Sequence, residues 1–268
     1  MARLHTEHAK LAYSDEAIIC DDVTVEIPDR MFTVIVGPNG CGKSTLLKSL
    51  TRLITPVSGA TLLDGKSLHE QSTKHVAKQV GLLPQGPVAP EGIRVIDLVS
   101  RGRYPHQGLF KPWSPEDERA VGAAMDATNV RELSSRFVDE LSGGQRQRVW
   151  MAVALAQETP ILLLDEPTTF LDVRYQIELL ELCRELNKRD HLTLVTVLHD
   201  LNQAARYADN IIAMKDGEVV ATGAPADVIT EELVRDVFGV EASIIQDPES
   251  GSPLMIPRWE GRVAERAD

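Results

Sequence analysis

Eight residues near the start of the chain have the types and spacing of a phosphate-binding loop. The sequence Gly-Pro-Asn-Gly-Cys-Gly-Lys-Ser at 37–44 matches the pattern G-x-x-x-x-G-K-S. An apolar stretch precedes it and a helical period follows it, so consecutive backbone N–H groups and a helix N-terminus can surround an anion. In that arrangement Lys43 reaches the β- and γ-phosphates of a nucleotide, and the Ser44 hydroxyl binds magnesium. The sequence therefore predicts a phosphate site rather than a chance glycine turn.

Two adjacent carboxylates follow a short apolar stretch later in the chain. Asp165 and Glu166 come directly after Ile-Leu-Leu-Leu at 161–164, and Pro167 follows them. The carboxyl ends of parallel strands line the ligand crevice of an open α/β sheet, so we expect Asp165 to hold the magnesium ion that Ser44 also binds. Pro167 favours an extended backbone at Glu166, which would aim this carboxylate at an attacking water as a general base. An acidic strand end in solvent is the alternative, and the upstream phosphate loop disfavours it.

The sequence Leu-Ser-Gly-Gly-Gln at 141–145 allows two interpretations. Its Ser and Gln satisfy the S-x-x-Q capping box, which starts a helix without any ligand. Its two glycines, however, are poor helix residues that leave backbone amides open to an anion. Arg146 and Arg148 also stand in a first turn, where the helix dipole prefers acidic side chains. The second interpretation is therefore a helix N-terminus that binds a phosphate held by another subunit.

These motifs require elements that bring them together, and the hydrophobic pattern supplies such elements. Short β-branched or apolar runs predict strands, and apolar residues at helical spacing predict helices. The predicted strands are 23–27, 31–36, 60–63, 80–83, 161–164, 193–198 and 211–214. The predicted helices are 44–53, 94–101, 115–128, 144 to about 157, 176–188 and 201–207. Strands and helices alternate on both sides of a helical stretch, which predicts an α/β fold with a helical insert in one core.

The same pattern sets the expected domain boundaries. The expected domain is 1–240, with its core at 1–86 and 159–240 and a helical subdomain inserted at 87–158. Residues 241–268 are expected to form a polar tail, because no clear periodicity continues into them.

The composition excludes several classes of function. The 268 residues include 28 Lys and Arg against 40 Asp and Glu, and this formal charge of −12 argues against a nucleic-acid partner. The longest apolar run, 149–156, is far shorter than the roughly 18 residues of a membrane span. Cys20, Cys41 and Cys183 are odd in number and far apart, so we predict neither a disulfide framework nor a metal site from them. Nearby amides and Lys43 are expected to lower the pKa of Cys41 and make its alkylation block nucleotide binding.

Six motifs stand in the order of one large family. They are the phosphate loop, Gln85 after the strand at 80–84, the 141–145 sequence, the 161–167 strand with its acids, Leu171-Asp172, and His199. From Tyr13 to about Gly239 the chain resembles the nucleotide-binding subunit of ATP-binding-cassette (ABC) transporters. The resemblance implies a P-loop NTPase core of the RecA-like type, an N-terminal antiparallel β subdomain, an inserted α-helical subdomain, and ATP hydrolysis.

The resemblance also implies roles for the motif residues. Tyr13 stacks on the adenine ring, and Asp172 lies in a loop that bridges two head-to-tail copies of the chain, each ATP being held between them. The implied catalytic residues are Glu166, which polarises the water, His199, which contacts the γ-phosphate, and Gln85, which reports nucleotide occupancy to the helical insert. The implied magnesium ligands are Ser44, Gln85 and Asp165. The implied nucleotide-binding residues are Tyr13, Gly37, Asn39, Gly40, Cys41, Gly42, Lys43, Ser44, Thr45, Ser142, Gly143, Gly144, Gln145 and Asp172.

Three further stretches narrow the resemblance. Arg-Gly-Arg-Tyr-Pro-His at 101–106, Pro-Thr-Thr-Phe-Leu-Asp at 167–172 and the stretch 197–204 are similar to ferric-siderophore importer ATPases, especially the ferric enterobactin type. This similarity implies integral-membrane permease subunits as partners, a periplasmic or lipoprotein substrate-binding protein as an indirect partner, and a place at the cytoplasmic face of the cell membrane. A non-transport ABC ATPase, such as the stand-alone cassette of iron–sulfur cluster assembly, is the alternative.

Overall fold

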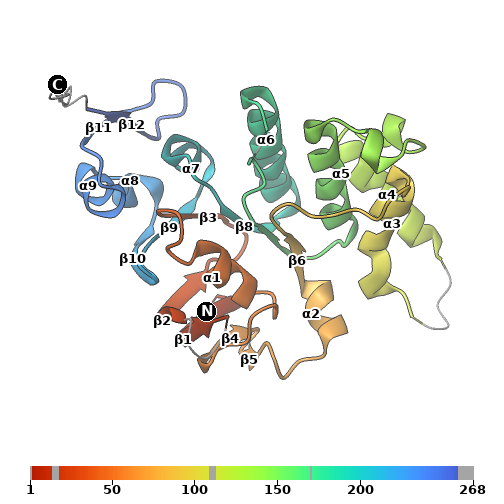
Figure 1. The fold of residues 1–268 in the computed structure, drawn as a ribbon, viewed down its shortest axis with the longest axis horizontal. Helices are drawn as coiled ribbons and strands as arrows, with labels where there is room; N and C mark the ends of the chain where they lie inside the picture. Colours follow the sequence, from red (N-terminus) through yellow and green to blue (C-terminus); the bar gives the residue numbers. More distant parts are fainter. Residues whose placement is uncertain (1, 14–17, 109–112, 170, 259–268) are drawn as a thin grey trace, which may run out of the picture.

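A twisted central sheet joins the elements that carry the motifs. Its strands are β3 (Phe32–Val36), β6 (Val80–Leu83), β7 (Ile161–Leu164), β8 (Thr193–Val197), β9 (Asn210–Lys215) and β10 (Glu218–Gly223). The computed structural model describes residues 2–13, 18–108, 113–169 and 171–258, and within them the strand order is β10-β9-β3-β8-β7-β6 (Figure 1). All neighbours run parallel except β10, which pairs antiparallel with β9 at one edge. The predicted α/β fold is confirmed.

Both faces of the central sheet are covered, as parallel strands require. On one face α6 (Val173–Asp190) and α7 (Leu201–Tyr207) pack against Val34, Leu162 and Leu194. On the other face α1 (Lys43–Ser49) packs between the central sheet and an antiparallel sheet, with Leu46 and Leu47 buried between them. The antiparallel sheet contains β1 (Leu4–Ala12), β2 (Ile18–Ile27), β4 (Ser58–Leu63) and β5 (Lys66–Ser67) in the order β2-β1-β4-β5. The phosphate loop therefore stands at the junction of two sheets.

The helices between β6 and β7 form a group beside the sheet, on the right in Figure 1. They are α3 (Val95–Ser100), α4 (Pro115–Ala127) and α5 (Gly143–Ala156), with 3₁₀ turns at Arg101–His106, Arg131–Leu133 and Val138–Glu140. Val95, Val121, Met125 and Val149 bury against one another in a separate core. A short α2 (Thr73–Gln79) leads into β6. Because α5 runs directly toward β7, it connects this helical group to the strand that precedes Glu166.

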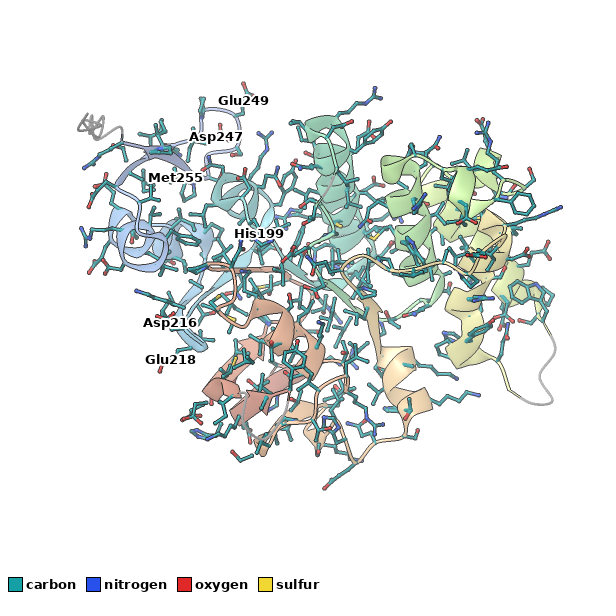
Figure 2. All side chains as sticks on the ribbon, viewed as in Figure 1. His199, Asp216, Glu218, Asp247, Glu249 and Met255 are labelled. Atoms are coloured by element: carbon teal, nitrogen blue, oxygen red, sulfur yellow. The ribbon has the colours of Figure 1, made fainter. Side chains whose placement is uncertain are left out.

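The C-terminal segment differs from the polar tail expected from the sequence. After α8 (Pro225–Val228) and α9 (Glu231–Phe238), β11 (Ala242–Gln246) and β12 (Pro253–Pro257) form an antiparallel hairpin. The Asn202 amide on α7 donates Nδ2 to Met255 O at 3.1 Å and accepts from Met255 N at 2.7 Å. Figure 2 shows Met255 on this hairpin, whose contact with α7 links it to the core. The last residues of the expected tail, 259–268, lie outside the described residues.

The stretch 101–106, which suggested a subfamily, is a packing unit of the helical group. A Cβ added to Gly102 would lie 2.4 Å from Val153 O, so only glycine permits this approach. Arg103 is buried and donates to Asp117 at 2.9 Å and to Glu158 at 2.9 Å. Burial raises the pKa of Asp117, but the hydrogen bonds from Arg103 and Ser114 outweigh it and lower this pKa to about 2.

Replacing Arg103 with Met is expected to destabilise the fold by roughly 3–5 kcal/mol, because Asp117 then stays buried without its charge partner. The matched control is Arg119→Met, since Arg119 is exposed in its ion pair with Glu158 and its loss is expected to cost below about 1 kcal/mol. Urea unfolding measures the free energy of unfolding of both variants. Because the pKa of Asp117 is lowered on folding, the ion-pair contribution is complete above about pH 4 and is lost as the pH falls toward 2. Equal stabilities of the two variants at neutral pH would contradict this assignment.

Candidate nucleotide site

The phosphate loop joins β3 to α1 and ends on a left-handed glycine. Gly42 has φ +102° at the N-cap of α1, and a Cβ there would lie 2.8 Å from Cys20 Sγ, so another residue would be strained and crowded. Lys43 is buried, and its Nζ donates to Gly37 O at 2.8 Å and to Pro38 O at 2.7 Å. The loop is thereby curled around its own lysine, with the start of α1 beneath it.

An open cavity of about 840 Å³ lies against this loop. The predicted site residues that line it are Tyr13, Gly37, Asn39, Gly40, Gly42, Lys43, Ser44, Thr45, Gln85, Glu166 and His199. Sequence reasoning missed Ile19, Pro38 and Phe238, which also line it. Phe238 is the last residue of the amphipathic α9, where an apolar side chain is most simply interpreted as core. The cavity thus unites residues from both sheets with the C-terminal helix.

Ser44 and Asp165 meet where α1 begins and β7 ends. Ser44 Oγ donates to Asp165 Oδ1 at 2.7 Å, while the buried Asp165 Oδ2 has no hydrogen-bond partner among the described residues. Burial raises the pKa of Asp165 and the Ser44 hydrogen bond opposes it. The described residues contain no group of three His, Cys, Asp or Glu side chains placed to hold a metal. Hydroxyl, amide and carboxylate oxygens are hard donors that suit magnesium, so the donor types of Ser44, Gln85 and Asp165 and the unpartnered Asp165 Oδ2 fit this ion.

The Glu166 carboxylate is held by three side chains. Gln85 Nε2 donates to Oε2 at 2.6 Å, and Thr169 Oγ1 donates to the same oxygen at 3.2 Å. His199 Nε2 lies 2.8 Å from Oε1. Figure 2 marks His199 at the end of β8, just before α7, whose first N–H groups are capped by Asp200. Two distant segments, through Gln85 and His199, and the turn of Glu166 itself, through Thr169, thus fix one carboxylate at the cavity.

The extended backbone expected at Glu166 is wrong. Glu166 has φ +50°, in the left-handed region, and Thr169 N donates to Glu166 O at 3.3 Å to close a tight turn. Pro167 disfavours the right-handed helical region for the residue before it, and the turn then selects the left-handed region over the extended one. Such a conformation costs a non-glycine residue about 1–3 kcal/mol. The turn, rather than proline alone, therefore aims the Glu166 side chain.

Tyr13 stands at the edge of the cavity with most of its surface exposed. The residue is 60% accessible, and Lys48 Nζ lies 5.9 Å from the ring centroid. Thr45 Oγ1 donates to Tyr13 Oη at the long distance of 3.5 Å. An exposed aromatic ring at the edge of the cavity can stack against a planar group.

Comparison with known proteins decides the family. A sequence model of ABC transporters matches residues 20–169. The chain belongs to the ABC transporter family. This cassette is 53% identical to the ferric enterobactin transport ATP-binding protein FepC of Escherichia coli (strain K12) over 98% of the chain and 96% of that protein. As the family membership implies, it is an ATP-binding protein and an ATPase.

Solved structures of the same family share the fold of the cassette. A metal-chelate type ABC transporter in an inward-facing conformation matches with a TM-score of 0.82 and 27% identity over 97% of this chain and 99% of that one. A dimeric bacterial ABC transporter cassette matches with a TM-score of 0.73 and 28% identity over 82% and 98%. In the part of the chain that the structure describes, no helix combines the length and apolar character needed to span a bilayer.

The capping-box interpretation of residues 142–145 is confirmed for the cassette. Ser142 Oγ accepts from Gln145 N at 3.3 Å, and Gln145 Oε1 accepts from Ser142 N at 3.1 Å. A Cβ added at Gly143 would meet no described atom within 4 Å, whereas one at Gly144 would lie 2.9 Å from the Tyr175 ring. The two glycines therefore have different surroundings. The space beside Gly143 is empty, whereas the absence of a side chain at Gly144 allows the Tyr175 ring to approach. The four residues lie outside the group that lines the cavity of this chain.

Two further predicted residues have structural partners. Arg148 lies over the Tyr175 ring at 5.5 Å, which accounts for a cation near the start of α5 without any ligand. Asp172 Oδ1 accepts from Tyr175 N at 3.1 Å and caps α6. Asp172 thus fixes the start of α6 beside the start of α5.

The lowered pKa expected for Cys41 is wrong. Burial raises the pKa of this thiol, and the charge of Lys43 with the loop N–H groups opposes the effect only in part. Burial likewise raises the pKa of Cys20 to about 11 and that of Cys183 to about 12. All three cysteines lie in the described ranges as free, buried thiols. The sequence shows the cation beside Cys41 but not how deeply Cys41 is buried, and this burial decides the direction of the pKa shift.

Native cassette is therefore expected to react slowly with maleimide at pH 7, because burial shields the three thiols and raises their pKa, which lowers the thiolate fraction. For Cys20 and Cys183, whose pKa values are raised to about 11 and about 12, the rate should be at least about 10-fold below that of the urea-unfolded chain. Mass spectrometry of each cysteine peptide against time measures this. Cys41→Ser serves as the control. A fast-reacting thiol in the native protein that is absent from Cys41→Ser would show that Cys41 is activated and would contradict its raised pKa.

Proposed function

We propose that this ABC ATPase powers the import of a ferric siderophore across the cytoplasmic membrane, with Glu166 as its general base. The observation that carries the catalytic part is the Glu166 carboxylate, held by Gln85, Thr169 and His199 beside the phosphate loop. The transport part rests on the 53% identity to a ferric enterobactin transport ATP-binding protein over nearly both full lengths.

Nucleotide binding is assigned to the cavity against the loop. Tyr13 stacks on the adenine, and the N–H groups of Asn39, Gly40, Cys41 and Gly42 with those of the α1 start surround the phosphates. Lys43, already directed at the loop carbonyls Gly37 O and Pro38 O, neutralises charge on the β- and γ-phosphates. Thr45 completes the loop side of the cavity. These residues bind and orient the triphosphate.

Magnesium is assigned to Ser44, Gln85 and Asp165. The buried, unpartnered Asp165 Oδ2 supports this assignment, because an uncompensated carboxylate oxygen is costly to bury and a cation there would compensate it. When bound, the ion neutralises charge that develops on the phosphate oxygens. Gln85 contacts Glu166 as well, so one side chain links the ion site to the base.

Hydrolysis is assigned to Glu166 and His199. Glu166 takes a proton from a water whose oxygen forms a bond to the γ-phosphorus, while the bond from that phosphorus to the bridging oxygen breaks and releases ADP and phosphate. His199 and Gln85 hold the two carboxylate oxygens in place, so the base loses little orientational freedom before reaction. His199 also contacts the γ-phosphate in this assignment.

A second copy of the chain is proposed to complete each site. Ser142, Gly143, Gly144 and Gln145 lie outside their own cavity, and the open side of Gly143 suits approach of a partner's phosphate. The dimeric cassette that matches with a TM-score of 0.73 supports a pair of copies, and the proposed pair is head to tail with Asp172 near the shared surface. The unit that dimerises is 1–240, with the core 1–86 and 159–240 and the helical insert 87–158.

The remaining partners follow from the transport assignment. Integral-membrane permease subunits dock at the cytoplasmic face beside the helical insert, and a substrate-binding protein delivers the ferric siderophore to them. No nucleic acid takes part, in keeping with the net charge of −12.

Glu166→Gln is expected to retain ATP binding and to lower hydrolysis by about 10²–10⁴-fold, because the amide keeps the shape of the side chain but cannot accept the proton. Phosphate release and equilibrium ATP binding are the measurements. Glu185→Gln, at an exposed ion pair on α6, is the control and should hydrolyse at the wild-type rate. Hydrolysis by Glu166→Gln at the wild-type rate would show that Glu166 is not the general base.

Uptake of radiolabelled ferric enterobactin tests the transport assignment directly. A strain deleted for this chain is expected to lose uptake, wild type to restore it, and Glu166→Gln to fail at equal expression. Uptake unaffected by the deletion, with other ferric siderophores also unaffected, would contradict the importer and favour the non-transport cassette.

A further inference from the structure

The turn that carries Glu166 is tied to α5 by one side chain. Gln147 Nε2 donates to Pro167 O at 2.8 Å, and this carbonyl belongs to the residue that follows Glu166. Around this contact, the Tyr175 ring fits against Gly144 and lies under Arg148. The start of α5 and the catalytic turn are therefore in direct, well-packed contact within one chain.

A second amide holds the same turn from another helix. Gln176 Nε2, on α6, donates to Thr168 O within the turn at 3.4 Å and to Leu171 O just after it at 3.0 Å. Gln203 Nε2 on α7 donates to Gln176 Oε1 at 2.9 Å. The two glutamines make the same kind of hydrogen bond, from a side-chain amide to a carbonyl of this turn. The two glutamines differ in the helix that carries them. Gln147 belongs to α5, which Ser142 caps, whereas Gln176 belongs to α6.

We propose that Gln147 is a positioning residue that transmits ATP binding in the partner's site to the Glu166 of its own site. This inference rests on the proposed dimer, in which the start of α5 contacts the partner's ATP. Gln147 stands about one helical turn after Gly143, and a helix moves as a rigid unit over so short a length. A shift of the α5 start therefore moves the amide that holds Pro167 O.

The turn converts this movement into a change at the carboxylate. Glu166 occupies a left-handed conformation and is closed to Thr169 through both backbone and side chain, so it has few alternative positions. Pro167 is rigid as well, since its ring fixes φ. Displacement of Pro167 O by Gln147 therefore turns the Glu166 side chain instead of being absorbed by the loop, and the two sites are coupled by this contact.

The test compares Gln147→Met with its matched control Gln176→Met, both close in shape to glutamine and both without a donor. Steady-state hydrolysis is measured against ATP concentration. For two coupled sites the wild-type Hill coefficient is expected above 1 and at most about 2. Gln147→Met should bring it to about 1 and lower kcat roughly 10-fold, whereas Gln176→Met should lower kcat and leave the Hill coefficient at the wild-type value.

Gln147→Glu, which also lacks the donor, repeats the test should the methionine variant fail to fold. ATP-driven dimerisation of each variant is measured in the Glu166→Gln background by gel filtration and should persist. A dimeric, cooperative wild type whose Hill coefficient survives in Gln147→Met, or falls equally in Gln176→Met, would overturn the role of Gln147 alone. A wild type that is non-cooperative and forms no ATP-driven dimer would overturn the proposed dimer and the coupling together.

Discussion

Ser44 and Asp165 are 121 positions apart and meet in a hydrogen bond of 2.7 Å, and the geometry of the site depends on this contact. It exists because β3, β8 and β7 are parallel neighbours, so that the phosphate loop after β3 and the acids after β7 emerge at the same edge of the sheet. The same edge receives His199 from β8 and Gln85 from β6. A slip of one strand by two residues would separate these groups by more than 6 Å, roughly two rises along a strand.

Burial and charge then give the two adjacent acids different properties. Asp165 is enclosed, its pKa is raised by burial, and one oxygen lacks a partner among the described residues, so the site favours a compact cation. Glu166 is turned away from it by a left-handed backbone and is surrounded by donors. One acid is thus suited to hold a metal ion and the next to accept a proton, although both follow the same strand.

The motifs predict the phosphate loop, the paired acids and the α/β fold, because these depend on local spacing and periodicity. The sequence does not reveal β1, whose alternation is broken by a bulge at His8 with φ +45°, or the C-terminal hairpin, which depends on the Asn202 side chain. Phe238 and Thr169 reach the site only through tertiary packing and a turn. The two errors have different origins. At Glu166 the rule for the residue before proline leaves two backbone regions open, and the turn closed by Thr169 selects the left-handed one. At Cys41 the burial that raises the pKa comes from tertiary packing, which the neighbouring residues do not reveal.

The central claim is that each ATP lies between the phosphate loop of one copy and Ser142 of the other. Photocleavage by vanadate, trapped with MgADP in place of the γ-phosphate, tests it most directly because light cuts the backbone next to the vanadate. A tagged chain with Lys43→Ala, which cannot trap vanadate on its own loop, is mixed with untagged wild type. The account predicts that the tagged chain is cut at Ser142 in the mixture and stays intact alone. A tagged chain left uncut in the mixture, while wild type is cut at its own loop, would contradict the shared site.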